Sequence, residues 1–310
     1  MSFSSTIKDE LSSIHLKDDA AQYAALAALT HTAGSITIGR NGMGIEYVTE
    51  NQNVGHLVSQ LATKLYAAQP AITLRQHERL KAKNTVVILS GACCSDILKM
   101  SGCLPSDENE PFEMGRIMPE LVSTENGMKA FLRGAFLGAG SVSNPKKGYH
   151  LEIVCRHERF AADLCALMEQ ASLNAKIAQR KSSFIVYMKD VKGICDMLTY
   201  IGAVEARLAI EDVQVFKSVA NDLNRLSNFE SANMQKTAQA AAQQLIDIEL
   251  LDKEMGLANL PPKLQEAAEV RLNNPEATLA ELADMLGIGK SGMNHRLNKL
   301  SEMARDIRLH

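Results

Sequence analysis

Hydrogen-bonding and cationic side chains are concentrated in one short stretch near the C-terminus, KSGMNHRLNK (290–299). Amide, hydroxyl and imidazole groups can read base edges in the major groove of DNA, whereas lysine and arginine bind backbone phosphates. The side chains suited to base readout are Ser291, Asn294, His295 and Asn298. Those suited to phosphate contacts are Lys290, Arg296 and Lys299, although Arg296 could read guanine instead. The stretch predicts a DNA-binding surface.

A helix has to carry these side chains, and residues 258–310 predict a helix-turn-helix. A first helix is expected over about residues 263–273. Thr278 caps a second, short helix, and Glu281 is its capping-box partner three residues later. Gly287 permits the turn into a third helix over about residues 290–304. Apolar residues at three- and four-residue steps would form one core: Leu279, Leu282, Ala283, Leu286, Met293, Leu297 and Leu300. A helical bundle that binds a protein partner is the alternative.

The rest of the chain contains an internal repeat. LAALTHTAGSI (26–36) aligns with LRGAFLGAGSV (132–142), and each is followed by a hairpin, a helix and a second strand pair. The pattern predicts a pseudo-twofold α/β (α+β) domain at residues 1–210, with repeats at about 1–110 and 111–210. Coincidental α/β patterning is the alternative.

Small residues four apart lie on the first helix of each copy, Ala28 and Thr32 in one and Gly134 and Gly138 in the other. They let two helix backbones approach closely, so the copies are expected to dock helix on helix.

Residues 211–257 predict a helical linker of one interrupted or two successive helices, with Ser231 as a possible cap and Gly256 as the end. Prolines then predict an extended hinge over residues 257–264.

Several basic residues follow or flank the second strand pairs, where they could contact a DNA backbone. They are Arg75, Lys81, Lys83, Arg180, Lys181 and Lys189. The net charge of −3 means that any such contact needs a local patch. Solvated faces or protection of an edge strand are the alternative interpretation.

Composition narrows the class of protein. Apolar residues make up 46% of the 310-residue chain and charged residues 22%, which is typical of a globular protein. Six cysteines without CxxC spacing predict reduced thiols, no metal site and no cofactor. The opening MSFSSTIKDELSSI does not resemble a signal peptide, and no apolar run reaches the roughly 18 residues of a membrane span. A cytoplasmic protein is expected.

The paired small-residue helices that end in glycine resemble those of the LAGLIDADG homing endonucleases. In those enzymes an acid before the terminal glycine of each motif holds a divalent cation over the scissile phosphate. The matching positions here are Ala33 and Ala139, whose methyl groups cannot bind a cation. The resemblance therefore implies the scaffold without catalytic residues. The alternative, a nuclease that uses Asp96, Glu152 or Asp190, lacks acids paired across the copies.

The three parts together resemble the WhiA family of sporulation and cell-division regulators of Gram-positive bacteria. The matching stretches are MSFSSTIKDEL, FLRGAFLGAGSVSNPKKGYHLE, YMKD, IGA, NRLSNFESAN and KSGMNHRLNKL. Phe229 stands where the family pattern suggests cysteine.

The WhiA resemblance implies a non-enzymatic, sequence-specific DNA-binding regulator of transcription. Its expected targets are genes of cell division and chromosome segregation, and of sporulation in filamentous relatives. The expected partners are double-stranded promoter DNA and a WhiB-like iron–sulfur regulator, with nucleoid association. The tandem copies form an internal pseudo-dimer, so a monomer is expected. A ligand-sensing or scaffold protein with weak DNA contact is the alternative.

Overall fold

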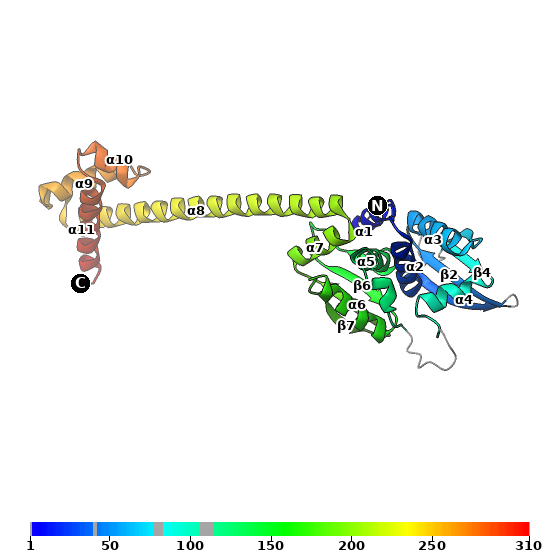
Figure 1. Cartoon of the computed structure of the whole chain (residues 1–310). Coiled ribbons are helices and arrows are strands. Elements are labelled where there is room, and N and C mark those ends of the chain that lie inside the picture. Colours follow the sequence, from blue (N-terminus) through cyan, green and yellow to red (C-terminus); the bar gives the residue numbers. More distant parts are fainter. Residues whose placement is uncertain (1, 40–41, 77–82, 106–114, 310) are drawn as a thin grey trace. The chain divides into compact units, whose positions relative to one another are not determined.

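The computed structural model describes residues 2–39, 42–76, 83–105 and 115–309 (Figure 1). The chain divides into two compact units, Met1–Val215 and Phe216–His310, and each is described by itself. The fold is mixed α/β followed by a helical helix-turn-helix, as predicted. None of the described helices is long and apolar enough to cross a membrane.

The first unit contains two copies of the same series of elements. The first copy is α1 (Phe3–Ser12), α2 (Asp19–Ala33), β1 (Gly34–Gly39), β2 (Gly42–Thr49), α3 (Gln52–Tyr66), β3 (Ala71–Gln76), β4 (Lys83–Ser90) and α4 (Cys93–Met100). After the 3-10 helix η1 (Pro119–Val122), the second is α5 (Glu125–Ala139), β5 (Gly140–Val142), β6 (Leu151–Cys155), α6 (Glu158–Gln170), β7 (Lys176–Arg180), β8 (Ser183–Met188) and α7 (Val191–Ile201). Two antiparallel sheets result, with the equivalent orders β1-β2-β4-β3 and β5-β6-β8-β7. The predicted internal repeat is confirmed.

Helices α2 and α5 pack against each other and join the two copies. A Cβ atom added at Gly134 would lie 2.6 Å from the carbonyl oxygen of Ala25, and one at Gly138 would overlap Thr32 Oγ1. The small residues therefore set how closely the two backbones approach, as the four-residue spacing predicted. Both helices end directly before a glycine that begins a strand, so their packing also fixes where the two sheets start.

Alternating side chains attach each sheet to these helices. In β2, Ile45 and Tyr47 are buried against the helices, and the hydroxyl groups of Tyr47 and Thr30 lie 2.9 Å apart. In β6, Leu151 and Ile153 are buried in the same way. Residues between them, such as Glu46 and Glu152, face the other side of their sheet because successive strand side chains point to opposite faces.

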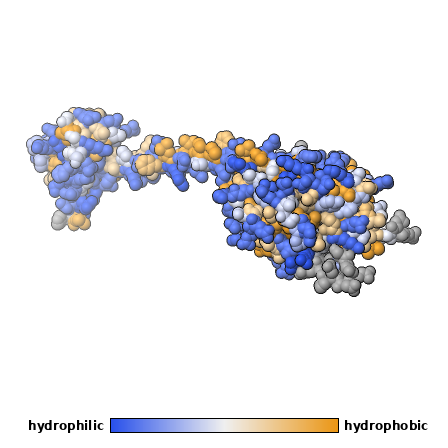
Figure 2. All heavy atoms as spheres, viewed as in Figure 1, coloured by the Kyte–Doolittle hydropathy of each residue, from blue (hydrophilic) through white to orange (hydrophobic). Residues whose placement is uncertain are grey.

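Helix α8 (Val204–Met255) is continuous, which corrects the predicted interruption. Ser231 lies inside this 52-residue helix and does not cap a second one. Its sequence contains neither proline nor glycine, and the scattered Ser and Asn residues oppose a helix only weakly. Gly256, with φ of 75°, follows the last turn as predicted. Apolar side chains lie at the surface of this helix (Figure 2). Phe216 and Leu223 are among the exposed ones.

The second unit is built from the end of α8, the 3-10 helix η2 (Leu257–Asn259), α9 (Pro262–Asn273), α10 (Leu279–Met285) and α11 (Lys290–Leu309). The predicted core is confirmed: Leu282, Ala283, Met293, Leu297 and Leu300 are buried, with Leu279 and Leu286 packed against them. Ile248 and Leu251 of α8 belong to the same core. The compact unit therefore begins earlier in the chain than residue 258.

The α2–α5 contact yields a stability prediction. Gly134→Ala should lower the free energy of unfolding of the first unit by about 1–3 kcal/mol, because the added methyl group meets backbone that cannot move alone. Gly148→Ala is the matched control, since nothing lies within 4 Å of its added Cβ. Urea unfolding curves would measure both, and equal midpoints for the two variants would contradict the proposed close contact.

Candidate nucleic-acid interface

A capping box and a glycine turn stabilise the helix-turn-helix locally. Thr278 Oγ1 accepts a hydrogen bond from the Glu281 backbone at 3.3 Å, and Glu281 Oε2 accepts one from the Thr278 backbone at 2.7 Å. This is the predicted capping box, and the hydrogen bond from the Thr278 backbone to the carboxylate lowers the pKa of Glu281. Gly287, with φ of 64°, makes the turn between α10 and α11. The turn closes with a 3.0 Å hydrogen bond from Ile288 to the Ala283 carbonyl.

Helix α11 has one buried and one exposed face. Met293, Leu297, Leu300 and Ala304 are buried in the core. The four residues predicted to read bases, Ser291, Asn294, His295 and Asn298, are all exposed. Because residues three and four apart share a face of a helix, Ser291, His295 and Asn298 form a continuous polar strip away from the core. The structure therefore brings the predicted base-reading residues together.

The cationic residues of α11 differ in their surroundings. The guanidinium of Arg296 lies 3.2 Å from Glu266 and 3.3 Å from the Lys263 carbonyl of α9, and its side chain is only 17% exposed. Lys299 Nζ lies 2.9 Å from Glu302, a pairing that raises the pKa of Lys299. Lys290 is exposed at the first turn. The contact with α9 thus gives Arg296 a bundle-stabilising role that its predicted place in the DNA surface did not include.

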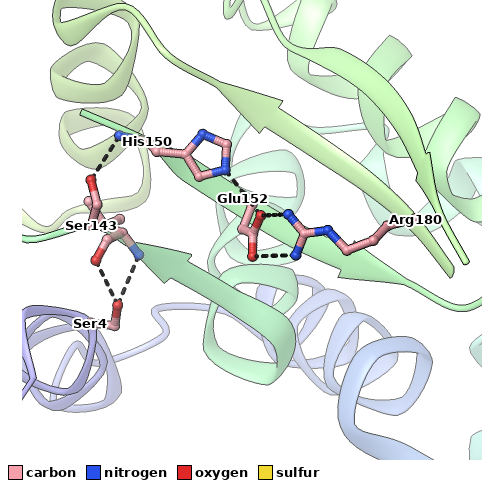
Figure 3. A network of polar contacts seen from close by, with 6 residues as sticks. Ser4, Ser143, His150, Glu152 and Arg180 are labelled. Carbon is pink, nitrogen blue, oxygen red and sulfur yellow. Dashed lines mark hydrogen bonds and ion pairs between the residues drawn. The ribbon is translucent and has the colours of Figure 1, made fainter. Parts of the chain in front are cut away.

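The sheets carry the same ion pair twice. Arg75 of β3 binds Glu46 of β2 at 2.9 and 3.1 Å. Arg180 of β7 binds Glu152 of β6 at 3.1 and 3.5 Å in the second copy (Figure 3). Sequence reasoning named Glu152 only as a possible nuclease acid and missed Glu46, although both follow the Gly-Ser of their copy by the same number of residues. The expectation that Glu152 has no matching acid in the other copy was therefore wrong, and each of the two glutamates is bound by an arginine.

Neighbouring groups extend the second of these pairs. His150 Nε2 lies 3.0 Å from Glu152 Oε2, so the carboxylate is shared between the imidazole and the Arg180 guanidinium (Figure 3). Lys189 Nζ lies 5.3 Å from the centre of the Tyr187 ring, within the range of a cation–π contact. Glu152 therefore compensates the charge of Arg180, whereas the contact of Lys189 with an aromatic ring leaves its positive charge in place.

The other basic residues predicted on the strands lie near the ends of the same hairpins. Lys83 is exposed at the start of β4, where it lies opposite Gln76 of β3 in the strand register, and Gln76 is next to Arg75. Lys181 is exposed beside Arg180, with φ of 54° in the tight turn between β7 and β8. Lys81 lies outside the described residues. Each copy thus brings an arginine and a lysine together at one end of its sheet.

The positions of the nuclease acids are occupied by the last residues of α2 and α5, Ala33 and Ala139. A guanidinium nitrogen of Arg156 donates a hydrogen bond to the carbonyl oxygen of Gly34, directly after Ala33. In the described ranges, no three His, Cys, Asp or Glu side chains lie close enough together to hold a metal ion. The residues at these helix ends do not fit a divalent cation, since they offer methyl groups and one positive charge.

The acids of the alternative nuclease lie on separate elements. Asp96 is in the first turn of α4. Glu152 of β6 is bound to Arg180 of β7. Asp190 caps α7 by accepting a 2.6 Å hydrogen bond from the Gly193 backbone.

A cavity of about 260 Å³ lies at the end of α2, and no pattern in the sequence indicated it. Its walls include His31, Cys103, Arg156 and His157. Burial lowers the pKa of His31 to about 4, and its Nε2 lies 2.6 Å from the Ser101 carbonyl, so the ring is neutral at pH 7. Burial also raises the pKa of the Cys103 thiol to about 12, which makes it a poor nucleophile.

Comparison with known proteins gives three family-model matches. They are the WhiA N-terminal LAGLIDADG-like domain at residues 19–102, the WhiA LAGLIDADG-like domain at 128–220 and the WhiA C-terminal HTH domain at 223–304. A relative from Clostridium tetani is 38% identical over 99% of this chain and 98% of its own length. One from Alkaliphilus oremlandii is 39% identical over 98% and 97%. Both are called "Probable cell division protein WhiA".

Two solved structures are also similar. The crystal structure of full-length WhiA from Thermatoga maritima superposes with a TM-score of 0.62, at 25% identity and over 99% of both chains. The N-terminal LAGLIDADG domain of a WhiA protein superposes with a TM-score of 0.51, at 21% identity, over 64% of this chain and 90% of that one. The second likeness concerns the fold alone.

A buried carboxylate connects the end of α11 to α8 and makes stability depend on pH. Burial alone would raise the pKa of Asp247, but hydrogen bonds from Ser301, Gln243 and Arg308 outweigh it and hold the pKa below its ordinary value of 3.8. Arg308 lies 2.7 Å from the carboxylate. A carboxyl group whose pKa is lowered by folding stabilises the fold above its unfolded pKa, and this contribution is lost as the pH falls through its folded pKa.

Asp247→Asn should therefore lower the free energy of unfolding of the second unit at pH 7 by about 1–3 kcal/mol. The difference from the unsubstituted protein should shrink below pH 3.8. Glu249→Gln, at an exposed position of the same helix, serves as the control. Chemical unfolding at pH 7 and at a pH below 3.8 would measure the free energy of unfolding of each variant. A destabilisation by Asp247→Asn that is equal at both pH values would contradict the prediction.

Proposed function

Because the chain belongs to the WhiA family, we propose that it is a non-enzymatic, sequence-specific DNA-binding regulator of transcription. The observation that carries the proposal is the exposed polar face of α11, on which the four predicted base-reading residues meet. The proposed targets are genes of cell division and chromosome segregation, in keeping with relatives called probable cell division proteins. Sporulation genes would be the targets in filamentous relatives.

In the proposed complex α11 enters the major groove of promoter DNA. Asn294 can donate to and accept from an adenine edge, and His295 and Ser291 can reach neighbouring bases. Lys290 and Lys299 bind phosphates and fix the register. Lys299 exchanges Glu302 for a phosphate, at little cost because an exposed ion pair contributes little stability.

The absence of enzyme activity is supported by the two helix ends. Metal-assisted phosphodiester hydrolysis needs oxygen ligands that hold the cation and activate water. Ala33 and Ala139 supply none, and the guanidinium of Arg156 at the Gly34 carbonyl repels a cation. Supercoiled plasmid incubated with the protein and Mg²⁺ or Mn²⁺ should remain supercoiled, and specific nicking that tracks the protein would overturn this part of the proposal.

In this proposal the sheets add backbone contacts. Arg75 and Arg180 would exchange their glutamates for phosphates while Lys83 and Lys181 contribute charge beside them. The proposal extends to a monomer in the cytoplasm, associated with the nucleoid, and to a WhiB-like partner. The ligand-sensing alternative is favoured by one observation, the cavity beside His31 and Arg156.

The proposed readout predicts two different effects of substitution. Replacing both Asn294 and His295 with Ala should weaken binding to the preferred site by about 1–3 kcal/mol for each base that is no longer read, and spare non-specific binding. Replacing Lys290 and Lys299 with Gln should weaken binding to all sequences alike and flatten the salt dependence. Preferred sites would come from sequencing of genomic fragments bound by the full chain. If both pairs acted alike, α11 would not be the element that reads sequence.

A further inference from the structure

A second cavity lies within the unit Phe216–His310, between the later part of α8 and the helix-turn-helix, and has a volume of about 510 Å³. It is lined by Lys236, Thr237, Ala240, Ala241 and Gln244 of α8, and by Arg271, Thr278, Leu279, Ala280, Lys290 and Asn294. The lining thus includes two residues of the proposed DNA surface, Lys290 and Asn294.

The charges around this cavity are all positive. Lys236, Arg271 and Lys290 contribute cations, and no carboxylate is among the lining residues in the described part of the chain. An anion is the species that such a lining attracts. Lys290 strengthens the attraction because it stands at the first turn of the 20-residue helix α11, where the backbone amides carry partial positive charge.

Arg271 supplies an independent observation. Its side chain is only 2% exposed, and one end of its guanidinium donates to the Ala277 carbonyl at 2.7 Å. Its Nε, however, has no hydrogen-bond partner among the described residues, and neither does the buried Oε1 of Gln244. A buried cation without a counter-ion is costly. An anion in the cavity would offset that cost, and rotation of the Gln244 amide would turn its NH₂ group to the same ligand.

We propose that this cavity binds a phosphate of the DNA backbone, held between Lys236 of α8 and Lys290 of α11, with Arg271 as the buried cation behind them. The inference rests on the proposed function, since it takes DNA lying across α11 as its starting point. Asn294 borders both the cavity and the exposed strip, so a duplex read by that strip has its backbone beside the cavity. Helix α8 thereby becomes part of the DNA-binding surface.

The first test compares two lysines of α8 in the full chain. Lys236→Gln should lower the slope of log affinity against log salt concentration by about 0.9, the effect of removing one lysine–phosphate interaction. The reduction should be the same on a duplex that carries a preferred site and on an unrelated duplex of equal length. Lys253→Gln is the matched control, because this lysine is exposed on α8 outside the cavity. A slope for Lys236→Gln equal to that of the control would overturn the proposal.

A second pair of variants avoids the buried Arg271, whose replacement could unfold the loop that it holds. Thr237 is exposed at the cavity, so Thr237→Glu adds a carboxylate there and Thr237→Gln adds a neutral group of the same size. The Glu variant should bind both duplexes several-fold more weakly than the Gln variant, with equal thermal midpoints for the two. Equal affinities would count against a phosphate in the cavity.

The source of the anion can be separated by two further measurements. In a series of duplexes, one backbone phosphate at a time is replaced by a neutral methylphosphonate. On one of these duplexes, Lys236→Gln and the unsubstituted protein should bind with the same affinity, because the phosphate that Lys236 contacts is already absent. If instead inorganic phosphate raised the thermal midpoint of the unsubstituted protein but not of Lys236→Gln, with DNA binding equal in both, the cavity would bind free phosphate and the proposal would fall. Failure of the proposed function would look different, because the unsubstituted protein would then bind both duplexes equally.

Discussion

The close packing of α2 against α5 is the constraint on which the first unit depends. Gly134 approaches the backbone of Ala25, and Gly138 approaches the side chain of Thr32, only because neither glycine has a side chain. Since each helix ends directly at the first residue of a strand, the distance between the helices determines where the two sheets begin. The same constraint explains why helices of this kind can persist when no acid remains at their ends. Ala33 and Ala139 end the two helices, and their methyl groups offer no ligand for a cation.

The two surfaces proposed to meet DNA differ in how freely their charges are available. On the sheets, Arg75 and Arg180 are already bound to glutamates, so a phosphate would have to compete with a carboxylate. Around α11 and the neighbouring part of α8, Lys236, Lys290 and Arg271 line one cavity without a carboxylate among its described residues. This difference favours the helix-turn-helix as the main source of the proposed affinity for DNA. The sheets would add to that affinity only where a phosphate replaces a glutamate at Arg75 or Arg180. Glu46 and Glu152 then limit non-specific attraction between the sheets and any polyanion.

Periodicity in the sequence was sufficient to predict the features that local patterns determine. The small-residue helix contact, the capping box at Thr278 and the core of the helix-turn-helix follow from residues a few positions apart, and the repeat follows from one such pattern that recurs in residues 26–36 and 132–142. Features that depend on distant partners were not predictable. The binding of Arg296 to α9, the two arginine–glutamate pairs and the burial of Arg271 each join elements whose proximity only the tertiary fold creates. The continuity of α8 was missed because Ser231 was interpreted as the cap of a second helix, although a serine inside a helix opposes it only weakly.

The participation of α8 in the core of the helix-turn-helix limits how this domain can be exchanged between proteins. Ile248 and Leu251 occupy the same apolar cluster as Leu282, Met293 and Leu297, and Asp247 anchors the far end of α11. A segment that started at residue 258 would expose that cluster to water and leave Arg308 without its carboxylate. A chimaera that transfers the DNA-binding specificity would therefore have to include the last turns of α8. The structural unit that would have to move together is a four-helix assembly, even though the helix-turn-helix motif itself occupies fewer residues.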